Sequence, residues 1–295
     1  MKTQLKKCLL IFIIFLAFTI SFCSVYSTFY TNSVKAFSMP FYNLQPCKLT
    51  LRAKFFTSYT TSIEERKCNI KLATKSINGT ILDVGEEFSF NKVVGARTEK
   101  RGYKTAKIIV GGKFTDGVGG GVCQVSTTLY NAVLLSGLKV TEYHPHTLPV
   151  SYVAPSFDAM VNSYTADLKF VNTTQNPIII MATADGSNLT FFIYGEPMQS
   201  KFIRESVVVE RTPKPLPEII VDEKQEYKEL FKGEEKIIQY GKEGIKSQGK
   251  LIEIVNGKKV SVKTIRKDTY LGMQDIIVIG TKEKVEEENF IIESA

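Results

Sequence analysis

Residues 117–131 read GVGGGVCQVSTTLYN, so a run of glycines leads directly into a helical pattern. Glycine adopts positive-φ conformations that other residues avoid, and the run therefore predicts a tight turn that aims the following helix. The first turn of a helix leaves backbone N–H groups unpaired and carries the positive end of the helix dipole. The pattern predicts a loop–helix junction with Cys123 in the first helical turn and Gly137 at the helix end.

A cysteine at such a junction favours the thiolate, which is the nucleophilic form of the side chain. The two histidines of the chain, His144 and His146, follow it after about twenty residues. A thiolate and a nearby base are the minimum set for covalent acyl transfer. We expect Cys123 to be the nucleophile and His146 its base, with His144 as the second choice. The plain alternative for each is an ordinary packed or surface residue.

Projection of this helix at about 100° per residue separates two sides. The apolar side holds Val125, Leu129, Ala132 and Val133. The other side holds Cys123, Thr127, Tyr130 and Asn131. We expect the apolar side to pack on the core and the other side to face a cleft.

The chain has 295 residues, of which 43% are apolar, and this is enough for two modules with cores and a tail. Its formal net charge is +8. The sequence contains no zinc-finger spacing, no aromatic–basic RNA motif and no long basic helix, so we expect no nucleic-acid partner. A basic surface suits an anionic cell-wall polymer, although a solvated lysine-rich surface explains the charge equally well.

Residues 8–26 carry no charged side chain, and Lys2, Lys6 and Lys7 precede them. A bilayer-spanning helix needs about 20 apolar residues, and the basic residues beside it stay in the cytoplasm. We expect residues 1–7 to be cytoplasmic and residues 8–26 to be a single-pass anchor in the cell membrane, with the bulk of the chain outside. A cleaved secretory signal, which would release the protein, is the alternative.

The remaining cysteines can be accounted for without Cys123. Cys8 and Cys23 fall inside the apolar run, and Cys47 can pair with Cys68 as a disulfide in an oxidising compartment. Cys123 is then the unpaired thiol outside the membrane.

Composition divides the rest of the chain. Residues 27–54 are a connector without periodicity, residues 55–196 form a first module, and residues 197–218 are a linker that three clustered prolines make stiff. Residues 219–281 are rich in charge, glycine and β-branched residues, which predicts a small elongated all-β module. Residues 282–295 are expected to be a mobile tail.

The first module mixes helical and strand signals, so its fold class is α+β. Residues 62–73 show helical spacing that includes Arg66, with Ser62 and Glu65 as a capping box. Residues 158–195 alternate between apolar and polar residues, which predicts an antiparallel sheet.

The two histidines lie in a stretch, residues 138–153, that is expected to be extended. Pro145 and Pro149 make it an edge or irregular strand. His144 and His146 share parity in this stretch, so both are expected to face one side.

Seven motifs follow one another along the first module: FTSYTTS, ING before DVGEEFSFN, VGARTEKRGY, GGGVCQVSTTLYNAV, EYHPHT, FDAMV and DLKFVN. In these motifs the chain resembles the VanW domain over residues 55–196. Tyr143 stands where that domain has an arginine, Thr147 where it has a serine, and Ser156-Phe157 where it has Gly-Leu. Residues 205–281 resemble a G5 domain, a cell-surface β module associated with N-acetylglucosamine or wall binding, adhesion and spacing.

The resemblance implies cell-wall chemistry. Some VanW-domain proteins are L,D-transpeptidases that make 3-3 peptidoglycan cross-links through a cysteine, which corresponds here to Cys123. The implied reaction transfers the acyl group of a stem tetrapeptide through a thioester, and D-alanine leaves. Peptidoglycan stem peptides and glycan are the implied partners, and no cofactor or metal is expected. The family takes its name from vancomycin-resistance gene clusters.

This reaction points to further site residues. Backbone groups that could hold the oxyanion belong to Gly120, Gly121, Val122 and Gln124. Candidates for substrate binding are Arg97, Arg101, Tyr103, Thr127, Tyr130, Asn131 and Asp158. The two arginines could hold a stem-peptide carboxylate by a two-point bond, and the alternative for them is a structural or solvated role. Asp158 is expected to orient a histidine or to cap a turn.

Three alternatives remain open. With water as the acceptor, the same residues would make a carboxypeptidase. Cys123, His144, His146 and a carboxylate could instead bind zinc. The third alternative is a membrane-anchored scaffold that binds the wall without catalysis.

Overall fold

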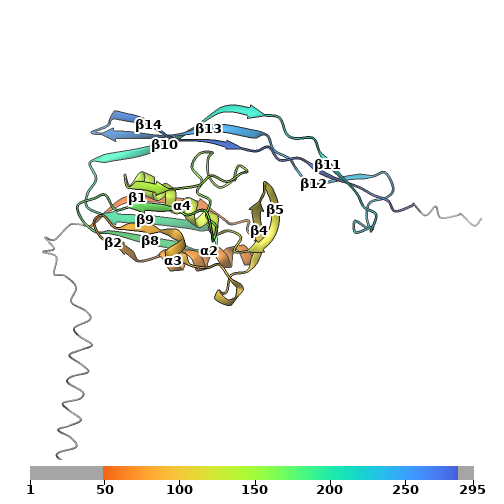
Figure 1. The fold of residues 1–295 in the computed structure, drawn as a ribbon, viewed down its shortest axis with the longest axis horizontal. Coiled ribbons are helices and arrows are strands. Elements are labelled where there is room, and N and C mark those ends of the chain that lie inside the picture. The colour runs from red at the N-terminus through yellow and green to blue at the C-terminus, as the bar shows by residue number, and fades with distance from the viewer. Residues whose placement is uncertain (1–48, 285–295) are drawn as a thin grey trace, which may run out of the picture. The chain divides into compact units, whose positions relative to one another are not determined.

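The computed structural model describes residues 49–284 of the chain (Figure 1). The predicted anchor at residues 8–26 lies outside this range, as does Cys47, so the anchor and the Cys47–Cys68 disulfide stay predictions. Within residues 49–284, no helix is both long enough and apolar enough to span a membrane.

A four-stranded antiparallel sheet forms the centre of the first module. Its strands, in order across the sheet, are β1 (Thr50–Ser58), β9 (Asn188–Gly195), β8 (Ile178–Ala184) and β2 (Thr80–Leu82). Helix α2 (Glu64–Ile77) packs against β8, and helix α4 (Val122–Leu135) packs against β1 and β9 (Figure 1). The two helices also contact each other, so both cover the same face of the sheet.

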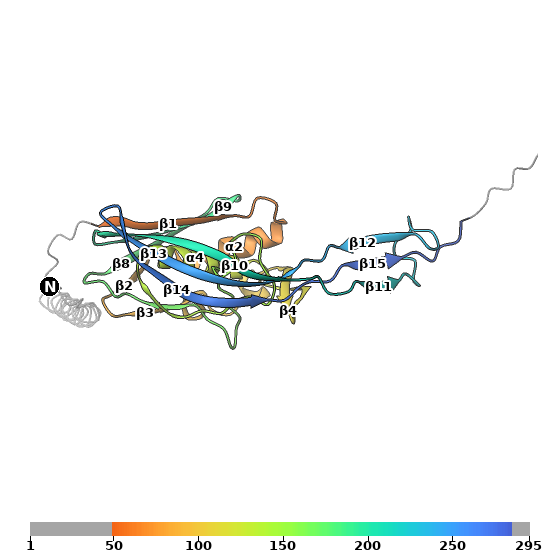
Figure 2. The same cartoon turned by 90° about the horizontal axis from the view of Figure 1, so that it is seen from above.

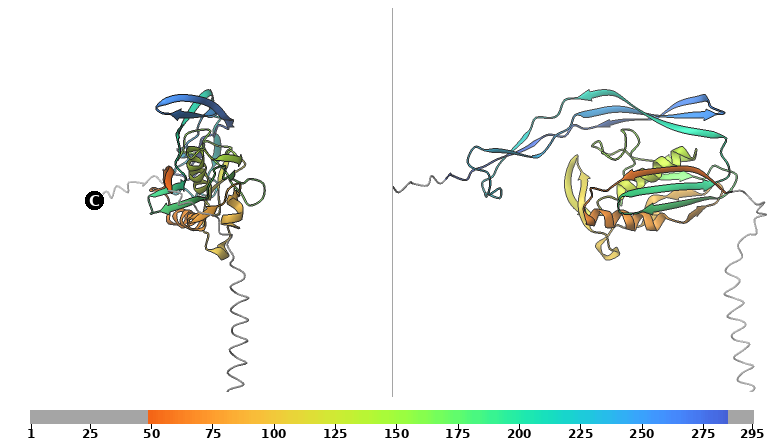
Figure 3. Two further views of the ribbon diagram at one scale, coloured as in Figure 1. Left: turned by 90° about the vertical axis from the view of Figure 1, so that its left-hand side faces the viewer. Right: turned by 180° about the vertical axis from the view of Figure 1, so that it is seen from behind.

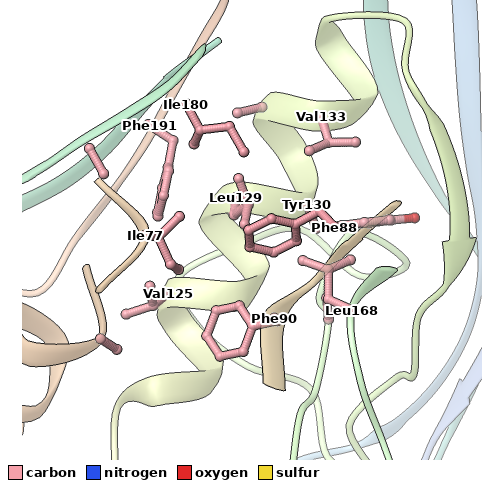
Figure 4. Packing of buried hydrophobic residues seen from close by; sticks show 14 of the residues in the cluster. Ile77, Phe88, Phe90, Val125, Leu129, Tyr130, Val133, Leu168, Ile180 and Phe191 are labelled. Carbon is pink, nitrogen blue, oxygen red and sulfur yellow. The ribbon is translucent and has the colours of Figure 1, made fainter. Parts of the chain in front are cut away.

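Alternation along the strands explains this packing. In β8, Ile178, Ile180 and Ala182 are buried, whereas Met181 between them is exposed. Side chains at every second position of a strand lie on one face, so this face of β8 turns toward the helices. Figure 4 shows Ile180 and Phe191 of the sheet meeting Leu129 of α4 and Ile77 of α2.

Smaller elements surround the helices. The strands β3 (Glu87–Ser89), β7 (Lys169–Val171) and β6 (Lys139–Glu142) form a second antiparallel sheet, with β7 in the middle. Helix α3 (Phe90–Val94) and the 3₁₀ turn η2 (Glu99–Arg101) lead to a hairpin of β4 (Thr105–Val110) and β5 (Lys113–Val118). This hairpin lies beside α2 (Figure 3), and β5 ends at the glycine run.

The C-terminal region is entirely β in its described part (Figure 2). One antiparallel sheet contains the long strands β10 (Ser200–Thr212), β13 (Gly244–Val255) and β14 (Lys258–Tyr270). A second sheet contains β11 (Glu218–Val221), β15 (Ile276–Ile279) and β12 (Glu235–Gln239), in which β11 and β15 run parallel. The predicted α+β class is confirmed in its coarse form, with helices and mostly antiparallel strands.

Three details differ from expectation. Residues 50–54 of the predicted connector belong to strand β1, because they pair with β9. Residues 200–212 of the predicted linker form strand β10, because they pair along β13, and only residues 213–217 with their prolines connect the two C-terminal sheets. The predicted capping box is wrong, because α2 begins at Glu64 after Ile63, which makes no side-chain cap. The Ser62 hydroxyl instead accepts a hydrogen bond from Arg66 Nη1 at 2.8 Å.

Candidate functional site

The glycine run forms a tight turn at the start of α4. Gly121 is the N-cap residue with φ +107°, and Gly119 has φ +91°. Both angles lie in the left-handed region that favours glycine. Gly120 is required for another reason: a Cβ there would collide with the backbone of β4, on which the turn packs directly. The Gly120 carbonyl also accepts a hydrogen bond from Asn69 Nδ2 at 2.9 Å, which helps to hold the turn.

We expect Gly120→Ala to destabilise the protein by about 1–3 kcal/mol, the usual cost of forcing an extra carbon into a packed site. The new Cβ would lie 2.7 Å from the Lys107 carbonyl oxygen and 2.8 Å from the Ala106 carbonyl carbon. Urea unfolding measures the difference. Gly117→Ala is the matched control, because its Cβ would meet the Ile108 side chain, nearest at the movable Cδ1 atom, and no backbone atom. Equal unfolding midpoints for Gly120→Ala and the parent would contradict this account of the turn.

Cys123 lies in the first turn of α4 and is partly exposed. Its Sγ atom is 3.3 Å from the Val161 carbonyl oxygen. The rest of α4 is buried on both sides as far as Leu134, so the expected division into a core side and a cleft side is wrong. The second side is covered because residues 157–161 pack along it: the Ala159 carbonyl accepts a hydrogen bond from Ser126 Oγ at 2.5 Å.

His146 is buried, and its imidazole lies close enough to Cys123 that each group shifts the pKa of the other. His146 Nδ1 lies 2.7 Å from Asp158 Oδ2, and the His146 backbone N–H donates to the same oxygen at 2.7 Å. Since Nδ1 is engaged by the carboxylate, Nε2 is the ring nitrogen that remains for the thiol. Cys123, His146 and Asp158 thus form a thiol–imidazole–carboxylate series, called the triad below.

The electrostatics of the triad favour charge separation. Burial alone raises the pKa of the Cys123 thiol, but the His146 hydrogen bond and charge, with the Arg97 guanidinium, outweigh burial and lower the pKa below its ordinary value of 9.0. Burial alone lowers the pKa of His146, but hydrogen bonds to Asp158 and Cys123 outweigh burial and raise this pKa to about 9. The triad therefore favours a thiolate beside an imidazolium more than an isolated thiol and imidazole would.

His144 is placed differently from His146. Strand β6 ends at Glu142, so the parity expected for the two histidines does not persist. The His144 Nε2 atom lies 3.0 Å from Glu142 Oε1, and its side chain is 35% exposed. The structure therefore brings His146, and not His144, into contact with Cys123.

Two arginines and a tyrosine lie close enough to Cys123 to interact electrostatically with it: Arg97, Arg66 and Tyr152. Arg97 Nη1 donates to Asn91 Oδ1 at 2.9 Å, and no bond from its Nη2 is recorded among residues 49–284. Burial, with the nearby Cys123, raises the pKa of Tyr152, so its hydroxyl stays neutral and can donate a hydrogen bond.

Backbone donors near Cys123 are fewer than expected. The Val122 and Gln124 N–H groups donate to the carbonyls of Gly119 and Gly121, at 3.1 and 3.0 Å, because the turn closes into the helix through these bonds. The Cys123 N–H has no such acceptor among the described residues. The geometry therefore offers the N–H of Cys123, rather than those of Val122 and Gln124, as an oxyanion donor.

Several other candidates lie away from the thiol or are engaged in packing. Arg101 Nη1 donates to the carbonyls of Val94 and Ala96, at 2.7 and 2.6 Å. Tyr130 is a core residue whose ring lies 5.8 Å from that of Tyr143. Tyr130 is therefore enclosed in the core, whereas Arg101 is an exposed residue whose Nη1 holds the chain at residues 94–96.

The remaining candidates are buried polar groups. Asn131 Nδ2 donates to the Thr127 and Phe157 carbonyls, at 2.6 and 2.8 Å, and Thr127 Oγ1 accepts from the Ala159 N–H at 2.9 Å. The Tyr103 hydroxyl is buried and has no hydrogen-bond partner within the part of the chain that the structure describes. Within residues 49–284, no group of three or more His, Cys, Asp or Glu side chains is arranged to hold a metal ion.

Sequence reasoning missed Arg66, Tyr152 and two C-terminal residues, Arg266 and Tyr270, that bind Asp158. Arg66 could have been recognised from the sequence, because it is a charged residue at a position of α2 where the helical spacing otherwise places apolar residues. It packs inward, and its Nη2 donates to Gln124 Oε1 at 2.8 Å. No local pattern marks the other three.

Comparison with known families matches two regions of the chain. The family described as "VanW like protein" matches residues 65–194, and the family described as "G5 domain" matches residues 205–282. Both resemblances found in the sequence are thereby confirmed. The G5 match includes most of β10, in agreement with the strand pairing.

Two curated relatives share the first region. The protein YoaR of Bacillus subtilis is 38% identical over 167 residues, which cover 57% of this chain and 54% of that protein. The "Vancomycin B-type resistance protein VanW" of Enterococcus faecalis is 30% identical over 138 residues, which cover 45% of this chain and 50% of that protein. The chain thus spans about half the length of each relative.

Two solved structures match the second region. The G5 domain of HP0197 is 25% identical, with a TM-score of 0.15, and the match covers 28% of this chain and 100% of that chain. The G5 domain of an IgA1 protease is 22% identical, with a TM-score of 0.18, and the match covers 30% of this chain and 100% of that chain.

Proposed function

Because the chain carries a VanW domain followed by a G5 domain, we propose that it is a cell-wall acyl transferase, an L,D-transpeptidase that makes 3-3 peptidoglycan cross-links. The observation that carries the proposal is the triad. Cys123 is partly exposed at the start of a helix, and His146 contacts it while Asp158 orients the imidazole.

The first half of the reaction forms a thioester. The Cys123 thiolate attacks the carbonyl carbon between the third residue of a stem tetrapeptide and its terminal D-alanine. The oxyanion that forms accepts a hydrogen bond from the Cys123 N–H. The C–N bond then breaks, and the His146 imidazolium gives its proton to the leaving amine, so that free D-alanine departs.

The second half regenerates the enzyme. A side-chain amine of a neighbouring stem attacks the thioester carbonyl, and neutral His146 takes the proton that this amine loses. The C–S bond breaks, and a thiolate beside an imidazolium remains. Asp158 stays ionised throughout, because His146, Arg266 and Tyr270 hold its pKa below the usual range against the effect of burial.

The proposed substrate is anionic, and the charge near the thiol supports this. Arg97 interacts with Cys123 and keeps donor capacity, so it is our candidate for the carboxylate of the departing D-alanine. Guanidinium groups bind carboxylates through paired, charge-assisted hydrogen bonds. The matched families and a relative named for vancomycin resistance support a cell-wall partner and a link to glycopeptide resistance.

The proposed location is the outer side of the cell membrane. The apolar run at residues 8–26, with lysines before it, supports a single-pass anchor that would hold the triad against the wall. The G5 domain would then contact glycan or peptide.

Intact mass spectrometry of the full chain with a disaccharide-tetrapeptide tests the function. We expect a mass increase on Cys123 that equals the substrate minus D-alanine, release of D-alanine, and loss of the adduct when an amine acceptor is added. Release of D-alanine without any cross-linked product would favour a carboxypeptidase. Absence of both adduct and D-alanine between pH about 6 and 9, where a thiolate should form, would favour the non-catalytic wall-binding scaffold.

A further inference from the structure

The two carboxylate oxygens of Asp158 face different domains. Oδ2 accepts both hydrogen bonds from His146, within the VanW domain. Oδ1 accepts from the Tyr270 hydroxyl at 2.6 Å and lies 3.4 Å from Arg266 Nη2. Tyr270 and Arg266 both belong to strand β14 of the G5 domain. All the side-chain partners recorded for Oδ1 among residues 49–284 therefore come from the second domain.

Arg266 is held firmly in this position. Its Nη1 donates to the Asp158 carbonyl oxygen at 2.6 Å, and its Nε donates to Asp268 Oδ2 at 2.6 Å. Its guanidinium carbon lies 4.5 Å from the ring centroid of Tyr143, which contributes a cation–π contact. Arg266 is 4% exposed, so these bonds form in a medium where they are stronger than in water.

The segment that carries Asp158, residues 155–158, is seated on the same sheet. The Ser156 N–H donates to the Tyr270 hydroxyl oxygen at 2.7 Å, and the Ser156 hydroxyl lies 2.7 Å from that of Ser247 in β13. Ser206 Oγ in β10 donates to the Pro155 carbonyl at 2.7 Å. A Cβ at Gly249 of β13 would lie 2.7 Å from the Ser156 carbonyl oxygen, so glycine permits this close approach.

The residue after His146, Thr147, is also hydrogen-bonded at the end of this sheet. The Leu271 N–H, directly after β14, donates to the Thr147 carbonyl at 2.8 Å. Both chain segments that meet in the His146–Asp158 bond are thus fixed to one end of β14. The remaining charged or titratable groups around the triad are Arg97, Arg66 and Tyr152, all from the VanW domain.

We propose that strand β14 of the G5 domain completes the triad, and that Tyr270 and Arg266 are positioning residues that fix the Asp158 carboxylate for His146. This inference rests on the proposed function in treating Cys123, His146 and Asp158 as the reacting set. A carboxylate bound only through Oδ2 can rotate away from an imidazole, whereas one whose Oδ1 is also bound cannot do so without breaking two further buried bonds. The G5 domain would then serve catalysis in addition to any wall binding.

The test is the pH dependence of Cys123 alkylation by iodoacetamide, read on the Cys123 peptide by mass spectrometry in the full chain. This readout reports thiolate formation and needs no peptidoglycan substrate. We expect Tyr270→Phe, which removes one hydroxyl, to move the alkylation midpoint upward by roughly 0.5–1 pH unit, because a loosened Asp158 supports the imidazolium less well. At a fixed pH below the midpoint, the alkylation rate should fall roughly three- to tenfold.

Tyr59→Phe is the matched control. The Tyr59 hydroxyl is also buried and also accepts a backbone N–H, that of Gly186 at 2.7 Å, but it does not contact Asp158. The midpoint of Cys123 alkylation in Tyr59→Phe should equal that in the parent chain. Arg266→Lys is the second variant, because lysine keeps the charge but cannot reach the Asp158 carbonyl, Asp158 Oδ1 and Asp268 together.

The outcomes separate the two proposals. An upward shift in folded Tyr270→Phe, with native near-UV circular dichroism and with Tyr59→Phe unchanged, supports the inference even if the parent chain releases no D-alanine. A midpoint that is unchanged or lower in folded Tyr270→Phe overturns it. If Tyr270→Phe does not fold, the alkylation midpoint of folded Arg266→Lys decides the inference by the same criterion.

Discussion

Replacement of Cys123 by alanine is expected to abolish both the covalent adduct and the release of D-alanine, with a rate loss of at least about 10³-fold. No other group in the triad can form the thioester, because only Cys123 carries a sulfur atom. The imidazole transfers protons, and the carboxylate orients the imidazole. The fold should survive, since Cys123 is a partly exposed residue and alanine fits the helix. Adduct formation and a thermal unfolding curve of the same sample measure the two effects.

Cys68→Ala is the matched control for this experiment. Cys68 is also partly exposed and also lies in a helix, α2, and its Sγ is 3.8 Å from the Gly102 carbonyl oxygen. It has no histidine beside it among the described residues, so Cys68→Ala should keep the parent rate. Equal activity of Cys123→Ala and the parent would remove the basis of the enzymatic proposal and leave the scaffold.

The second large effect is expected at the other two members of the triad. His146→Ala and Asp158→Asn should each lower the rate about 10²- to 10⁴-fold, the range in which general acid–base catalysis contributes. His144→Ala should leave the rate close to that of the parent, because His144 pairs with Glu142 and not with Cys123. Steady-state rates of D-alanine release compare the three variants, and a greater loss in His144→Ala than in His146→Ala would contradict the assignment.

The same pair determines the pH profile. The pKa of Cys123 is lowered, so the rate should rise as the pH rises through this value and the thiolate forms. The pKa of His146 is raised to about 9, so the rate should fall above that pH as the imidazolium loses the proton that D-alanine needs. The expected profile is a bell whose alkaline limb lies near pH 9. In His146→Ala, alkylation of Cys123 should require a higher pH than in the parent.

The sequence predicts the loop–helix junction well, because its signals are local. Gly119 and Gly121 have the positive φ angles that the glycine run implies, and Gly137 follows the end of α4 with φ +72°. Antiparallel pairing of β8 with β9 follows likewise from alternation and the turn at residues 185–188.

Periodicity is a poorer guide where packing comes from distant segments. The projection of α4 placed Tyr130 and Asn131 on an open side, yet residues 157–161 and the G5 sheet cover both. His144 and His146 were given a common face by strand parity, but β6 stops at Glu142 and the chain then turns irregularly. In both cases the contacts that determine the structure join residues too far apart in the sequence to fall within one short segment.

The residues that hold Asp158 in place are still harder to predict from the sequence. Tyr270 and Arg266 are 112 and 108 residues away from it in the chain. Neither residue has a neighbouring motif that indicates chemistry, because their strand reads as an ordinary alternating one. Only the three-dimensional arrangement shows that β14 ends against the carboxylate.

A ribosome making this chain adds Arg266 and Tyr270 long after Asp158, since more than a hundred residues separate them. During translation the nascent polypeptide would therefore hold Cys123 and His146 for some time before their last support emerges. The thiol would then gain its full reactivity only after residues 266–270 have been made and have folded against Asp158.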